Sequence, residues 1–161
     1  MTDGASRSPG VDQPVETSGG GTGRDGSRGD TIVGTERVTT ALPAVAASVS
    51  TARRFVAATM RRRAALPETI DVACLLTSEL VTNALVHARS RVELDVLVSE
   101  RGFRIEVGDT SPTDPQRRDP TPDGSSGRGL HIVDVMSSRW GSGPTGNGKK
   151  VWFELDAAHL A

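Results

Sequence analysis

Two neighbouring segments alternate apolar with polar residues, and this alternation constrains the fold more than any other feature. In residues 92–98, valines and leucines largely alternate with acidic residues, and in residues 103–107 apolar residues alternate with Arg and Glu. A short turn at residues 99–102 joins the two segments. A period of two predicts half-buried strands, and the short connection predicts an antiparallel hairpin. The apolar face of this hairpin needs helices to cover it.

Two segments with helical periodicity precede the hairpin. Pro43 stands where the first can begin, and its apolar residues recur at spacings of three and four over residues 45–60. The second opens around Pro67 and carries an apolar stripe over residues 70–88. These spacings predict two helices, each with one apolar face. Cys74 lies on the second stripe, so we expect it to be a small buried residue.

The remaining elements complete the predicted fold. We expect a first strand at residues 32–40, a short helix with apolar residues at spacing three over 130–136, and two closing strands around Trp140 and at 151–155. The order is therefore β-α-α-β-β-loop-α-β-β. It predicts an α+β fold, a two-layer α/β sandwich with a mixed, mostly antiparallel sheet and three helices on one face. Crossover connections are too few for a doubly wound sheet.

Composition divides the chain at about residue 30. Residues 1–30 hold eight glycines and only four apolar residues, so we predict a disordered tail there and one domain over residues 31–161. The net charge of −1 gives no basic field for nucleic acid. The single cysteine excludes an intramolecular disulfide. We find neither a long uninterrupted apolar run nor an apolar leader, so we expect a cytoplasmic protein that makes no membrane contact.

Polar side chains interrupt the apolar second helix at one place. Glu79 and Asn83 are four residues apart, so they project from the same face among leucines and valines. An amide oxygen suits Mg²⁺ when phosphate oxygens and water complete the coordination, and a neighbouring carboxylate suits a general base. Taken alone, the pattern is explained more simply by a polar stripe that faces solvent.

Two further features come before the short helix. Asp109 ends the second strand of the hairpin, where it could accept a hydrogen bond from an exocyclic amine such as that of adenine, or simply begin a turn. An aperiodic, proline-rich stretch at residues 110–126 follows, as in a lid or binding loop. It leads into Gly127-Arg128-Gly129, whose backbone N–H groups at a helix start can bind a phosphate, although flexible loops often contain the same pattern.

The order of these motifs resembles that of the GHKL (Bergerat-fold) ATPases and kinases. Glu-Leu-Val-Thr-Asn-Ala at 79–84 resembles the N box, Asp-Thr-Ser-Pro at 109–112 the first glycine box, and Gly-Arg-Gly-Leu at 127–130 the second. Residues 148–155 resemble the closing strand of that fold. The similarity covers residues 37–156 and is closest to the anti-sigma-factor serine/threonine kinases.

The resemblance implies a role for each matching residue. Asn83 binds the Mg²⁺ that bridges the phosphates of ATP, Glu79 is the general base, and Asp109 recognises the adenine amine. The other residues implied in nucleotide binding are Gly127, Arg128, Gly129 and Lys149. ATP and Mg²⁺ are thus the expected cofactors.

The resemblance also implies an activity and partners. It suggests an ATP-dependent protein serine/threonine kinase that phosphorylates a STAS-type anti-sigma antagonist and sequesters a sigma factor. Several relatives work as homodimers, so a homodimer is one expected state. The alternative function is a nucleotide-binding protein-interaction module without phosphotransfer.

This sequence departs from the family pattern at two places. Ser111 and Thr113 take the positions of the two glycines in the first glycine box, which predicts a stiffer loop. Lys150 stands where the closing strand usually has Thr, so we expect one hydrogen bond fewer on the adenine side. Glu79, Asn83 and Asp109 are all retained.

Overall fold

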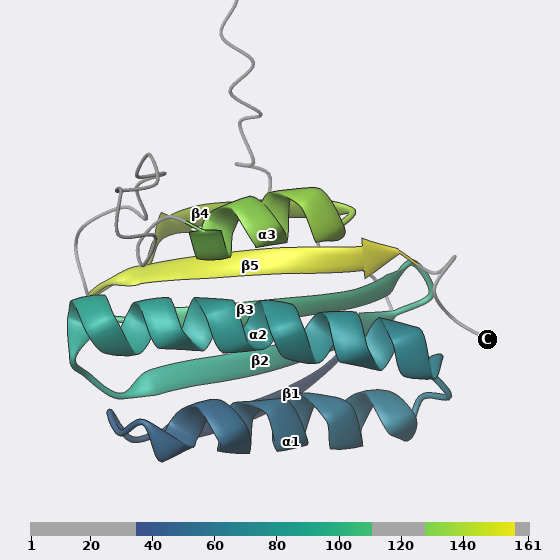
Figure 1. Cartoon of the computed structure of the whole chain (residues 1–161), viewed down its shortest axis with the longest axis horizontal. Helices are drawn as coiled ribbons and strands as arrows, with labels where there is room; N and C mark the ends of the chain where they lie inside the picture. The colour runs from purple at the N-terminus through teal and green to yellow at the C-terminus, as the bar shows by residue number, and fades with distance from the viewer. Residues whose placement is uncertain (1–34, 111–127, 157–161) are drawn as a thin grey trace, which may run out of the picture.

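The structure, a computed structural model, describes residues 35–110 and 128–156. The predicted tail at residues 1–30 and nearly all of the predicted lid lie outside the described residues. Within them, the elements follow the predicted order: one strand, two helices, a strand hairpin, a third helix and two closing strands. Figure 1 shows a single sheet with all three helices on one face, so the predicted two-layer α+β fold is confirmed.

The sheet has five strands in the order β1-β2-β3-β5-β4. The strands are β1 (Glu36–Leu42), β2 (Val92–Ser99), β3 (Gly102–Asp109), β4 (Arg139–Pro144) and β5 (Lys149–Asp156). Every pairing among them is antiparallel, so the expectation of a mixed sheet is wrong for the described strands. The reason is topological: β4 runs in the same direction as β3, but β5 lies between them.

The helices cover the face of the sheet that carries the apolar residues of the alternating pattern. They are α1 (Ala47–Arg61), α2 (Pro67–Ala88) and α3 (Arg128–Met136). Fully buried side chains from both layers form one core, including Val56, Met60, Leu76, Val81, Leu94, Ile105 and Phe153. Val45 does not belong to this core, because it precedes α1 and is 51% exposed.

Helix α2 is the central core helix. It is the one helix of the described part that is long and apolar enough to cross a membrane, and eight of its residues are buried within the fold. Its packing against α1, α3 and the sheet accounts for that apolar character. Cys74 is only half-buried, contrary to expectation, because it sits at the edge facing α1, where its thiol donates to the Arg53 carbonyl oxygen at 3.5 Å.

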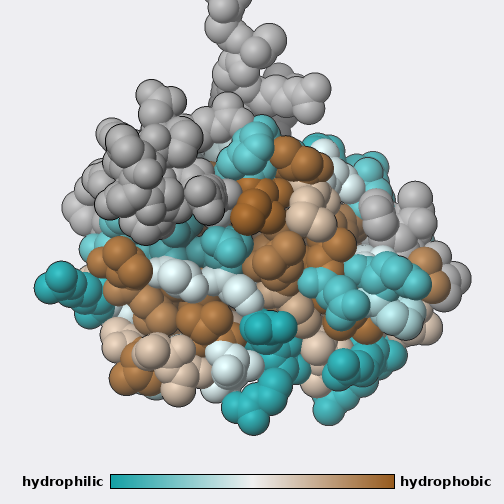
Figure 2. Space-filling view, in the orientation of Figure 1, coloured by the Kyte–Doolittle hydropathy of each residue, from teal (hydrophilic) through white to brown (hydrophobic). Residues whose placement is uncertain are grey.

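Helix α3 lies beside α2 and next to the edge strand β4 (Figure 1). Leu130 and Val133 are buried as predicted, whereas Met136, the third apolar residue of that spacing, is 40% exposed. The Trp140 indole N–H donates to the Asp134 carboxylate at 2.8 Å, which ties β4 to α3. Val135 is also exposed, and Figure 2 shows apolar side chains gathered over α3 and the adjoining part of α2.

Candidate nucleotide-binding site

The second half of α2 presents the two polar residues singled out in the sequence. Glu79 and Asn83 are both half-buried, one helical turn apart. Within the described part of the chain, neither side chain makes a hydrogen bond or an ion pair. Ser78, by contrast, directs its hydroxyl to the Cys74 carbonyl oxygen of its own helix at 2.7 Å. A half-buried carboxylate beside an amide therefore has acceptor and donor capacity to offer a ligand.

Gly129, at the start of α3, lies directly against these two side chains. A β-carbon added to Gly129 would be 2.7 Å from Glu79 Oε2 and 3.4 Å from Asn83 Nδ2. Gly129 has an ordinary helical backbone, since Gly102 is the one glycine with positive φ among the described residues. A β-carbon at this position would therefore crowd the Glu79 carboxylate. The structure therefore brings Gly129 next to Glu79 and Asn83, although Glu79 and Gly129 are 50 positions apart in the sequence.

A second pair of residues meets where β3 ends and β5 begins. Asp109 and Lys149 are register partners on the helix-facing side of the sheet, with 3.7 Å between Lys149 Nζ and Asp109 Oδ2. Both are buried, at 7% exposure each. Gly148 permits this arrangement, because a β-carbon on it would lie 1.8 Å from the Asp109 carbonyl oxygen. The end of β3 and the carboxyl end of α2 lie at the same end of the fold (Figure 1).

The arrangement fits a nucleotide. The start of α3 has backbone N–H groups that can bind an anion, and Gly129 packs there directly against Glu79 and Asn83. Asp109 is a buried carboxylate where β3 ends. The family model of the histidine kinase-like ATPase domain matches residues 42–155 of this chain.

The chain belongs to the histidine kinase-like ATPase family. Membership implies ATP as the bound nucleotide and an ATP-dependent kinase or ATPase activity. None of the curated proteins compared with the chain matches it. In this ATPase domain, the described residues contain no group of three or more His, Cys, Asp or Glu side chains placed to hold a metal ion. Asn83, the residue that the sequence predicts as the metal ligand, is described and half-buried.

Other predicted site residues fall at the border of the described part. Gly127 lies outside it, as do Ser111 and Thr113 of the altered glycine box. Arg128 is the first residue of α3, and only its backbone is described.

Lys150 does not lie on the face of the sheet that carries Asp109, contrary to the expectation that it takes a place beside this residue. Successive residues of a strand point to opposite faces, and Lys149 is the one that faces Asp109. Lys150 points to the outer face, which we define as the side of the sheet away from the helices. Its amine donates to Glu106 Oε2 at 2.9 Å and to Asp95 Oδ2 at 3.3 Å.

Sequence reasoning missed the ionic cluster that Lys150 joins. Asp95 and Glu106 are cross-strand neighbours on the outer face, yet they are only 1% and 5% exposed. Like charges directly opposite each other destabilise a sheet unless a cation is placed between them. Lys150 supplies that cation, and Thr39 and Arg37 of β1 also donate to Asp95.

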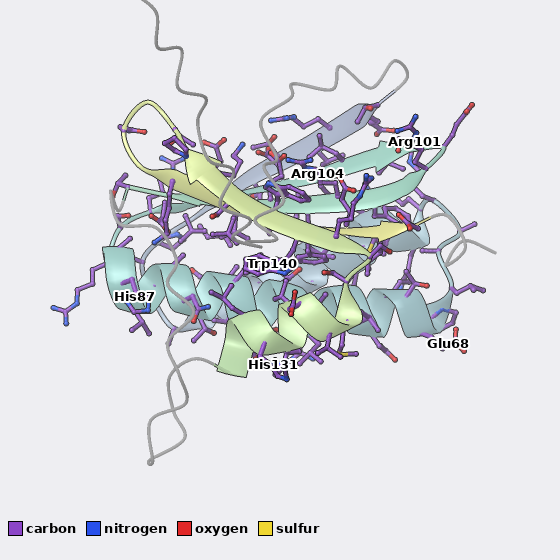
Figure 3. All side chains as sticks on the ribbon, turned by 90° about the horizontal axis from the view of Figure 1, so that it is seen from above. Glu68, His87, Arg101, Arg104, His131 and Trp140 are labelled. Carbon is purple, nitrogen blue, oxygen red and sulfur yellow. The ribbon has the colours of Figure 1, made fainter. Side chains whose placement is uncertain are left out.

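A second part of the outer face is organised by Arg104. Its guanidinium donates to Glu106 at 2.8 Å and to Glu154 at 3.1 Å, and it stacks 3.8 Å from the centre of the Trp152 ring. Figure 3 shows Arg104 on the side of the sheet opposite the helices, whereas Trp140 lies on the helical side. The sequence does show charged residues at the outward positions of four strands. Which of these charges pair with one another depends on the strand register, which the sequence alone does not give.

Proposed function

We propose that the chain binds Mg²⁺ and ATP and transfers the γ-phosphoryl group to a serine of a partner protein. One observation carries this proposal: Gly129, at the start of α3, packs directly against Glu79 and Asn83, two half-buried side chains without partners in the described part. A metal ligand and a general base are thus adjacent at the start of a helix that can bind phosphate.

Each residue has a distinct part in this proposal. Asp109 accepts a hydrogen bond from the 6-amino group of adenine, and Asn83 offers its amide oxygen to the metal ion. When bound, Mg²⁺ neutralises charge on the phosphates. Gly127, Arg128 and Gly129 line the phosphate side. Glu79 accepts the proton of the serine hydroxyl as that oxygen takes the γ-phosphoryl group and ADP leaves.

The proposed partners follow from the resemblance to the anti-sigma-factor kinases. The phosphorylated partner is a STAS-type anti-sigma antagonist, and a sigma factor is sequestered when the antagonist is modified. We further propose that the protein acts in the cytoplasm, forms a homodimer, and contacts neither nucleic acid nor membrane directly.

A phosphotransfer assay tests this proposal. Purified protein is incubated with γ-labelled ATP, Mg²⁺ and a cognate STAS protein, and label on the STAS protein is counted. Glu79→Gln is expected to lose about 10²- to 10⁴-fold in rate, the usual contribution of a general base. Glu68→Gln is the matched control, because Glu68 is an exposed glutamate in the first turn of the same helix.

The outcomes separate the kinase from the alternative function. Transfer that is lost in Glu79→Gln and kept in Glu68→Gln supports the kinase. ATP binding without any transfer favours a nucleotide-binding interaction module, which the altered glycine box at Ser111 and Thr113 also favours. Transfer that is equal in wild type and Glu79→Gln removes Glu79 from the base role.

A further inference from the structure

Helix α3 is short, and its placement decides how the two helices of the candidate site meet. It spans nine residues, Arg128–Met136, and its second residue, Gly129, lies against Glu79 and Asn83. A β-carbon on Gly129 would lie 2.7 Å from Glu79 Oε2, so the contact leaves little free space between the helices. A small shift of α3 therefore changes the surroundings of the Glu79 carboxylate directly.

Apolar packing holds α3 on the core but does not fix its position along or about its own axis. Leu130 and Val133 are buried, whereas Val135 and Met136 are exposed. Burial of apolar surface is non-directional, so these contacts allow a short helix to slide or turn slightly. A hydrogen bond is directional, because it weakens steeply when its angle departs from linear. A polar contact in the last turn of α3 can therefore fix the position that the apolar contacts leave open.

The contact between Asp134 and Trp140 is of this kind. The indole N–H of Trp140 donates to the Asp134 carboxylate at 2.8 Å. Trp140 is half-buried and packs against the core, and Figure 3 shows it on the helical side of the sheet. Asp134 is five residues from Gly129 in the sequence, which is about 7.5 Å along a helix. The bond therefore acts on α3 near the opposite end from its contact with Glu79.

Trp140 is itself held in place by strand β5. It pairs in register with Phe153, whose side chain is fully buried. Its neighbour Gly141 lies so close to the Trp152 ring of β5 that a β-carbon there would be 2.7 Å from the ring atom Cζ2. Strand β4 is thus packed tightly on β5 at this point, and α3 is tied to a tryptophan whose own position is fixed by the sheet.

Resting on the function proposed above, we propose that Asp134 and Trp140 are positioning residues for the phosphate end of the candidate site. Their hydrogen bond holds the start of α3 in place against Glu79. Neither side chain touches the nucleotide, and both act through the placement of α3. Loss of the bond weakens the binding of the phosphates and leaves the binding of the base unchanged, because Asp109 belongs to β3 and not to α3.

The affinities of the full chain for Mg²⁺-ATP and for adenosine separate positioning from general damage to the fold. Trp140→Phe removes the N–H donor and keeps an aromatic ring, and Asp134→Ala removes the acceptor. Each variant should bind ATP about 3- to 10-fold more weakly than wild type, in line with the usual contribution of one hydrogen bond. Adenosine has no phosphates and should bind wild type and both variants equally in an NMR titration. A loss of folded protein would weaken the binding of both ligands alike.

Further variants connect the effect to the hydrogen bond itself. Asp134→Asn keeps an oxygen acceptor, so it should bind ATP as wild type does. The double variant of Asp134→Ala and Trp140→Phe should bind ATP no more weakly than either single variant, because both changes remove the same bond. Asp71→Ala replaces an exposed aspartate of α2 as the matched control and should bind as wild type does. Asp134 is exposed, so Asp134→Ala tests the proposal even if circular dichroism shows that Trp140→Phe is unfolded.

The results distinguish this inference from the function on which it rests. If wild type, Asp134→Ala and Trp140→Phe all bind ATP equally, the pair has no positioning role, although the protein still binds ATP. The role is also overturned if adenosine binding is weakened as much as ATP binding, or if the losses of the two single variants add in the double variant. If wild type does not bind ATP at all, the proposed function fails and the inference fails with it.

Discussion

Gly129 approaches Glu79 so closely that a β-carbon on Gly129 would lie 2.7 Å from the Glu79 carboxylate oxygen Oε2. The two residues belong to different helices, α3 and α2, and their contact lies at the proposed phosphate end of the candidate site. The backbone of Gly129 is ordinary helix, so this contact is what distinguishes glycine from alanine at the position.

Replacing Gly129 by Ala should therefore separate stability from activity. Alanine is favoured over glycine within a helix by about 0.5–1 kcal/mol, and the crowded atom is the far end of a flexible side chain. We expect thermal unfolding at an unchanged or slightly higher temperature. Phosphotransfer should fall at least about 10-fold, because the Glu79 carboxylate must move from its position as base. Full activity in Gly129→Ala would contradict this account of the site.

Gly148→Ala should act on the fold itself. The added β-carbon would lie 1.8 Å from the Asp109 carbonyl oxygen and 2.6 Å from Thr110 Cα. Both are backbone atoms, so the clash cannot be relieved by a side-chain rotation. Overpacking of this kind typically costs about 1–3 kcal/mol of unfolding free energy, which urea titration measures. Gly146→Ala is the control, since nothing lies within 4 Å of its β-carbon position. Equal midpoints for the two variants would refute the close packing of Gly148 on Asp109.

Two buried threonines of the helices should respond in opposite ways to replacement by valine. Thr77 is fully buried, and its hydroxyl has no hydrogen-bond partner in the described part of the chain. Thr59 is also buried but donates to the Phe55 carbonyl oxygen at 2.9 Å. We expect Thr77→Val to be neutral or stabilising and Thr59→Val to cost about 0.5–1.5 kcal/mol in urea unfolding. The reverse order would show that the Thr77 hydroxyl is satisfied.

The outer-face cluster predicts a loss of stability at high pH. Burial lowers the pKa of the Lys150 amine, but its hydrogen bond to Glu106 and the charges of Glu106 and Asp95 outweigh that effect, so the pKa lies above 10.5. A raised pKa in the folded state stabilises the protein below the unfolded value of 10.5. This contribution is lost as the pH rises through the folded pKa.

Comparison with Lys150→Arg isolates the contribution of this amine. The guanidinium keeps its charge throughout the range, and all other titrating groups are shared by the two proteins. The unfolding free energy of wild type relative to Lys150→Arg should fall above about pH 10.5. A difference that stays constant from pH 9 to about pH 12 would show that Lys150 gains nothing from its two acidic partners.

The sequence predicted the elements well where local periodicity decides them. The alternation over the hairpin and the apolar stripe of α2 led to the observed strands and helix, because each pattern depends on neighbours within one turn or one strand. The close contact between Glu79 and Gly129 could be anticipated only through the motif order of a known family. Nothing in the local sequence brings together residues on two helices.

Long-range register accounts for what was missed. The burial of Asp95 and Glu106 depends on the pairing of β1, β2, β3 and β5, which local pattern does not specify. The two lysines at the start of β5 are another case in which the local sequence does not decide the position of a side chain. Counting outward from the buried Val151 places Lys149 on the helical face and Lys150 on the outer face, but only once the strand is known to extend that far.

The central claim is that this domain binds ATP with Asp109 at the base, and calorimetric titration of Mg²⁺-ATP into Asp109→Asn tests it most directly. Asp71→Asn serves as the control, because Asp71 is an exposed aspartate in the first half of α2. A lost hydrogen bond to a charged acceptor costs about 1.5–3 kcal/mol, so Asp109→Asn should bind ATP about 10- to 150-fold more weakly than wild type. Asp71→Asn should bind as wild type does. Equal affinity of wild type and Asp109→Asn for ATP would contradict the account.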